Sequence, residues 1–127
     1  VFKVFGYKSE GQPYFAACIN GKTAAVGTIT SPTISGGIGK INLKYCVPYT
    51  ESKGVKFKID ILQGGNVVKT LTVENTSAAK LTAYDYSADV NVSGDFQILI
   101  TNLSPSAVAD SNKDRFAIWA LNWTKME

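Results

Sequence analysis

Residues 28–43 read TITSPTISGGIGKINL, and this stretch decides the fold of the chain. A threonine-rich apolar segment ends at Ser31-Pro32, a glycine cluster follows, and an alternating segment begins at Lys40. Proline has no amide to donate to a strand ladder, and glycine supplies backbone with positive φ. We therefore expect a sheet to turn a corner here, which makes the stretch a construction feature rather than a catalytic one.

The rest of the chain is dominated by strand patterns. In residues 55–61 apolar side chains alternate with charged ones, which places one face in a core and the other in water. The same period recurs in residues 41–47, 67–73, 81–90 and 96–100. Gly64-Gly65-Asn66 is a hairpin signal between two such segments.

These patterns predict an all-β fold, an antiparallel β-sandwich of jelly-roll type, because short turns separate the strands and no helical pattern lies between them. The stretch Asn75–Lys80 is the one that could be helical, and it is a single turn at most. The residues expected in the core are Leu43, Phe57, Ile59, Phe96, Ile98 and Ile118.

The segment 115–124 departs from simple alternation because it is apolar on both sides. Strict alternation places Phe116, Ile118 and Ala120 on one face and Trp119, Leu121 and Trp123 on the other. Such a strand is covered on both sides, or it exposes an aromatic side chain for contact. We expect at least one tryptophan in the core. The alternative is a surface tryptophan that stacks on a sugar ring or on a partner.

Length and composition limit the class of protein. The 127 residues suffice for one domain with a single core. A net charge of +3 with dispersed lysines indicates no nucleic-acid footprint, and no apolar run approaches the ~20 residues of a membrane span. Because the chain starts at Val1 without a methionine, we expect residues 1–127 to be a single β-sandwich domain, one module of a longer secreted protein.

Catalytic signatures are missing from the sequence. The chain has no histidine, which removes the commonest general base, the Ser-His-Asp triad and most transition-metal sites. The ten carboxylates lie mostly in turns or on outward strand positions, and no motif marks a glycosidase pair. The glycine cluster lacks the spacing of a phosphate-binding loop and leads into a strand. We therefore predict that the domain is not an enzyme.

One loop carries a possible metal site. In the run 110–114, oxygen-bearing side chains stand at alternate positions, a spacing with which loops wrap Ca²⁺. The ligands would be Asp110, Asn112 and Asp114, holding a structural calcium ion as the only cofactor. The alternative is a polar turn in which these side chains cap backbone amides or pair with neighbouring cations.

Two cysteines, Cys18 and Cys46, fall on or near separate strands. A disulfide would close a loop of about 29 residues, worth roughly 3–4 kcal/mol in the chain-entropy model. Their apolar neighbours fit two buried thiols equally well. An even cysteine count with few charges favours a secreted setting, and the pairing stays open.

Several segments together resemble a known family. They are residues 16–22, 30–40, 67–70, 91–96 and 112–118. They resemble a jelly-roll, galactose-binding-like accessory module of secreted and surface proteins of gut-type Gram-negative bacteria. That module is appended to extracellular nucleases, hydrolases and lipoproteins. The resemblance implies a largely non-catalytic domain that is secreted or held at the cell surface.

Two functions remain open. The first is an accessory module that binds glycan through aromatic side chains, with amides and carboxylates supplying directional hydrogen bonds. The second is a structural or adhesive spacer that packs on a neighbouring domain or a protein partner. The residues favoured for glycan binding are Trp119, Tyr49, Tyr84 and Tyr86, with Tyr7 and Tyr14 as further candidates. Neither function needs nucleic acid or a membrane span.

Overall fold

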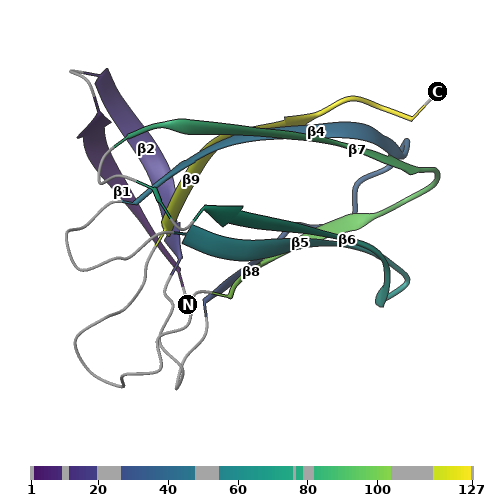
Figure 1. Ribbon diagram of the computed structural model, residues 1–127. Helices are drawn as coiled ribbons and strands as arrows, with labels where there is room; N and C mark the ends of the chain where they lie inside the picture. The colour runs from purple at the N-terminus through teal and green to yellow at the C-terminus, as the bar shows by residue number, and fades with distance from the viewer. Residues whose placement is uncertain are drawn as a thin grey trace.

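The computed structural model describes residues 2–9, 12–19, 27–47, 55–75, 77–78, 82–103 and 116–126. They form two antiparallel sheets packed face to face (Figure 1), and no helix occurs among them. The strands are β1 (Phe2–Ser9), β2 (Gln12–Ile19), β3 (Thr28–Thr30), β4 (Ile38–Cys46), β5 (Val55–Gln63), β6 (Asn66–Asn75), β7 (Tyr84–Val92), β8 (Gln97–Asn102) and β9 (Phe116–Trp123). The five-stranded sheet has the order β1-β2-β9-β4-β7, and the four-stranded sheet has the order β3-β8-β5-β6. The predicted antiparallel β-sandwich is confirmed.

The predicted corner is also confirmed. Strand β3 belongs to the four-stranded sheet and β4 to the five-stranded sheet, so the chain changes layers between them. Ser31, the first residue after β3, is fixed against β8 by two hydrogen bonds. Its amide donates to the Ile98 carbonyl and its Oγ accepts from the Ile98 amide, both at 2.8 Å. Gly36 and Gly37 then take φ values of 97° and 72°. These conformations are in the left-handed region that favours glycine.

The core lies between the sheets, where the alternating strands turn their apolar faces toward each other. Phe57 and Phe116 stack with ring centroids 4.4 Å apart, and Tyr45 meets Phe57 edge-on at 5.7 Å. All six residues predicted for the core are at most 4% exposed: Leu43, Phe57, Ile59, Phe96, Ile98 and Ile118. The hairpin signal is confirmed as well, because Gly64 and Gly65 both have positive φ and connect β5 to β6.

Strict alternation is wrong for the second half of β9. Ala120 has a φ of 54°, and the register between β4 and β9 shifts between Asn42 and Lys44. This bulge inserts one residue and exchanges the faces beyond it. Leu121 and Trp123 therefore pack against the core, and Trp123 lies edge-on to Phe96 with centroids 6.2 Å apart. One tryptophan is on the core side, as expected, while Trp119 stays on the opposite face.

The register also bears on the two cysteines. Cys18 on β2 and Cys46 on β4 are both register partners of Ala117 on β9. At ordinary strand spacing their Cα atoms are about 10 Å apart, whereas a disulfide requires less than about 7 Å. The arrangement does not fit a Cys18–Cys46 disulfide, and Cys46 is fully buried.

Candidate functional site

The most distinctive surface is the outer face of the five-stranded sheet, meaning the side turned away from the four-stranded sheet. Residues of β4 that point inward, such as Ile41 and Leu43, are buried in the core. The alternate residues therefore face outward, and register sets them beside outward residues of β7 and β9. The outer face carries Lys40, Asn42, Lys44, Asp85, Ser87, Asp89, Trp119 and Asn122.

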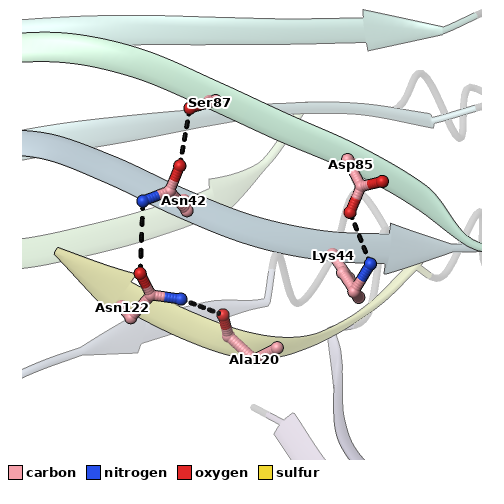
Figure 2. A network of polar contacts seen from close by, with 6 residues as sticks. All are labelled: Asn42, Lys44, Asp85, Ser87, Ala120 and Asn122. Atoms are coloured by element: carbon pink, nitrogen blue, oxygen red, sulfur yellow. Dashed lines mark hydrogen bonds and ion pairs between the residues drawn. The ribbon is translucent and has the colours of Figure 1, made fainter.

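A hydrogen-bonded row crosses this face through three neighbouring strands (Figure 2). The Ser87 hydroxyl donates to Asn42 Oδ1 at 2.6 Å, and Asn42 Nδ2 donates to Asn122 Oδ1 at 3.2 Å. Asn122 Nδ2 donates in turn to the Ala120 carbonyl at 3.0 Å, within the bulge. The row fixes the orientation of both amides and presents them at an exposed surface.

A second row lies two residues further along β4. Lys44 Nζ contacts Asp85 Oδ1 at 2.6 Å, and both side chains are substantially exposed (Figure 2). On the other side, Lys44 is the register partner of Trp119. An exposed ion pair contributes at most about 1 kcal/mol to stability, so the effect of this pair is mainly to order the two side chains beside the indole.

Trp119 is anchored from one side. It is half-buried and packs against Cys46 and Ala117, which are fully buried in a small cluster separate from the main core. The indole is therefore held in place while part of it stays accessible. An ordered, partly exposed aromatic ring beside fixed polar groups suits a flat ligand that has both an apolar face and hydroxyl groups.

The outer face ends in a hollow of about 490 Å³. It is lined by Gly39 and Lys40 of β4, by Asp89 and Asn91 of β7, and by the segment 124–126 that continues beyond β9. That segment is tied to β4, since the Gly39 amide donates to the Thr124 carbonyl at 2.8 Å and the Thr124 amide donates to the Lys40 carbonyl at 2.9 Å. The hollow lies four residues along β4 from Lys44, about 13 Å at strand spacing.

Of the aromatic residues favoured for glycan binding, the structure describes Trp119, Tyr84 and Tyr86, and it places them on different faces. Among these three, Trp119 alone lies on the outer face. Tyr84 and Tyr86 turn inward, where Tyr84 stacks on Tyr45 with centroids 5.5 Å apart and Tyr86 packs on the core. Burial raises the pKa of the Tyr86 hydroxyl above its ordinary value. We therefore carry Trp119 forward and leave these two tyrosines out of the site.

The side chains of the other residues predicted for a site fall outside the part of the chain that the structure describes. Tyr49, Asp110, Asn112 and Asp114 lie outside the described residues, and so do the side chains of Tyr7 and Tyr14, whose backbones pair in β1 and β2. Calcium binding by Asp110, Asn112 and Asp114 therefore stays a prediction. Within the described ranges, no group of three or more His, Cys, Asp or Glu side chains is placed to hold a metal ion. The same ranges contain no helix that could span a membrane.

Sequence reasoning missed most of the polar residues of the outer face. Asn42, Ser87 and Asn122 are individually ordinary, and nothing in the chain marks them as neighbours. The sequence indicates only that these residues take outward positions on alternating strands. It does not indicate the strand order, and that order places Asn42 beside Asn122, about 80 residues away, and beside Ser87, about 45 residues away.

The fold is a jelly roll. Among solved structures, it is similar to a carbohydrate-binding module, TmCBM61, determined with β-1,4-galactotriose (TM-score 0.58, 15% identity, 98% of this chain and 88% of that one). It is similar to the K3 cleaved adhesin domain of Lys-gingipain from Porphyromonas gingivalis (TM-score 0.60, 9% identity, 87% and 74%). It is also similar to the xylan-binding domain CBM22-2 of Paenibacillus barcinonensis Xyn10C (TM-score 0.53, 12% identity, 99% and 88%). No protein-family model matches the chain, and no curated protein matches its sequence.

Proposed function

We propose that this domain is a non-catalytic, glycan-binding module of a secreted or cell-surface protein, and that it binds carbohydrate on the outer face of the five-stranded sheet. The observation that carries the proposal is the half-exposed indole of Trp119 beside the hydrogen-bonded row of Ser87, Asn42 and Asn122. Structural similarity to carbohydrate-binding modules supports the proposal.

The chemistry of this face suits sugars. The apolar face of a pyranose ring stacks on an indole, and its hydroxyl groups both donate and accept hydrogen bonds, as amides do. The outer face extends about 13 Å along β4 from Trp119 to the hollow, which favours an oligosaccharide lying along the strands over a single sugar. A shallow, exposed site of this kind gives weak binding, with Kd of about micromolar to millimolar.

Affinity electrophoresis against a panel of soluble polysaccharides tests the proposal, with calorimetry on any polysaccharide that retards the protein. Trp119→Ala should weaken binding about 5- to 150-fold, because truncating a stacking aromatic typically removes 1–3 kcal/mol. Thr72→Ala, a truncation at an exposed position of β6 on the other sheet, is the control and should leave binding unchanged. Circular dichroism and the Tm establish that both variants fold.

The outcomes separate the proposal from its rival. Equal binding by the Trp119→Ala and wild-type proteins would contradict the proposed face. Absence of binding to every polysaccharide would favour the structural or adhesive role. For that role the specific observations are the similarity to an adhesin domain and the exposure of Val67 and Val68 (54% and 48%) near the β5–β6 turn.

A further inference from the structure

Charged residues are among those that line the hollow at the end of the outer face. Lys40, Lys125 and Asp89 line it, and within the described part of the chain none of the three is in an ion pair. Lys44, in the row nearest Trp119, is by contrast neutralised by Asp85 at 2.6 Å. Among the lining residues that the structure describes, two cations stand against one anion, a balance of one positive charge.

One of the two lysine stems packs on neighbouring backbone, and the backbone that carries the other lysine is fixed. The side chain of Lys125 runs over Gly36, with its aliphatic carbons 3.6–3.8 Å from the position a Cβ would occupy there. The backbone of Lys40 is held on one side by Thr124, whose Oγ1 accepts the Lys40 amide at 3.0 Å. Holding the stem of a lysine in place lowers the side-chain entropy that binding by its ammonium group would otherwise cost.

We propose that the hollow binds a singly charged acidic group on a glycan, so that the outer face prefers acidic oligosaccharides to neutral ones. The inference rests on the proposed function, whose ligand class it narrows. The ammonium groups of Lys40 and Lys125 would donate to the acidic oxygens, and Asp89 and Asn91 would hydrogen-bond the neighbouring hydroxyl groups. The acidic group is a uronic-acid carboxylate or a sulfate ester, which carry the same charge.

The expected size of the preference follows from the exposure of these lysines. An exposed ion pair changes an equilibrium constant by about 2- to 5-fold, and two lysines opposed by Asp89 should give a preference of that same size. The preference should also weaken as salt is added, because screening at ionic strengths near 1 M shortens the Debye length to about 3 Å.

Calorimetry on matched pairs of polysaccharides tests the inference. One pair is polygalacturonate and its carboxyl-reduced, neutral form, and the other is carrageenan and its desulfated form. The wild-type protein should bind the acidic member of at least one pair about 2- to 5-fold tighter at low salt. Lys40→Gln with Lys125→Gln should abolish that ratio, while Lys69→Gln, which removes a charge from β6 on the other sheet, should keep it.

Each result bears on the inference. If the acidic-to-neutral affinity ratio is lost in the double variant but kept in the Lys69 variant, the result supports acidic-group binding in the hollow. The polysaccharide pair that shows the ratio then tells whether the group is a carboxylate or a sulfate. Equal binding of acidic and neutral forms would overturn the inference while the glycan-binding face stands. A ratio that survives the double variant would overturn it too. Failure to bind any of these four forms would overturn the inference, and absence of binding across the whole polysaccharide panel would contradict the proposed function itself.

Discussion

Gly37 is buried at the point where the segment after β9 crosses the start of β4. A Cβ at this position would lie 2.7 Å from the Cβ of Met126 and 2.8 Å from the carbonyl oxygen of Val92. Its φ of 72° is also one that residues with a Cβ rarely adopt. The sequence predicts the corner from the glycine cluster, but the close approach of a segment almost 90 residues later is visible only in the structure.

Gly37→Ala should therefore lower the free energy of unfolding by about 3 kcal/mol, from both the backbone conformation and the steric clash. Gly65→Ala is the matched control, because Gly65 also has positive φ (85°) but has open space around it. Gly65→Ala should lower the free energy of unfolding by about 1 kcal/mol. Urea unfolding measures both changes in the free energy of unfolding. Equal losses in the two variants would show that the close approach of Met126 to Gly37 adds nothing to the destabilisation.

At the scale of elements, the bulge in β9 determines the candidate site. Without the extra residue at Ala120, alternation would turn Trp123 outward and Asn122 inward, and the polar row with Asn42 would not form. Alternation predicted correctly that Ile118 lies in the core, and it failed only beyond the bulge. Alanine carries no signal for positive φ, so no sequence pattern could have announced the shift.

Ala120→Gly should raise the free energy of unfolding by about 0.5–1 kcal/mol, because glycine relieves a φ of 54° that is unfavourable for alanine. Ala88→Gly makes the same chemical change in β7, where φ is not positive, and should instead lower stability by about 0.5–1 kcal/mol. Thermal melting of the two variants compares them directly. If both variants were destabilised by the same amount, the result would contradict the claim that Ala120 is strained in the bulge.

At the scale of the whole molecule, the sequence predicts the layers and most of the core but not the order of strands. Period-two alternation identifies which residues are buried, as Phe57 and Ile98 show. Strand order depends on long-range pairing that leaves no local trace, and the outer face is assembled by that order from β9, β4 and β7. This is why Trp119 could be proposed from the sequence whereas its polar neighbours could not.

The central claim is that glycan binds on the outer face of the five-stranded sheet, and amide NMR titration tests it most directly. With a polysaccharide fragment that binds the domain, we expect the largest shift changes at the indole Nε1–H of Trp119 and in residues 40–44, 85–91 and 119–126. The β5–β6 hairpin, which includes Val67 and Val68, should be unaffected. Changes confined to that hairpin or to the four-stranded sheet would contradict the claim.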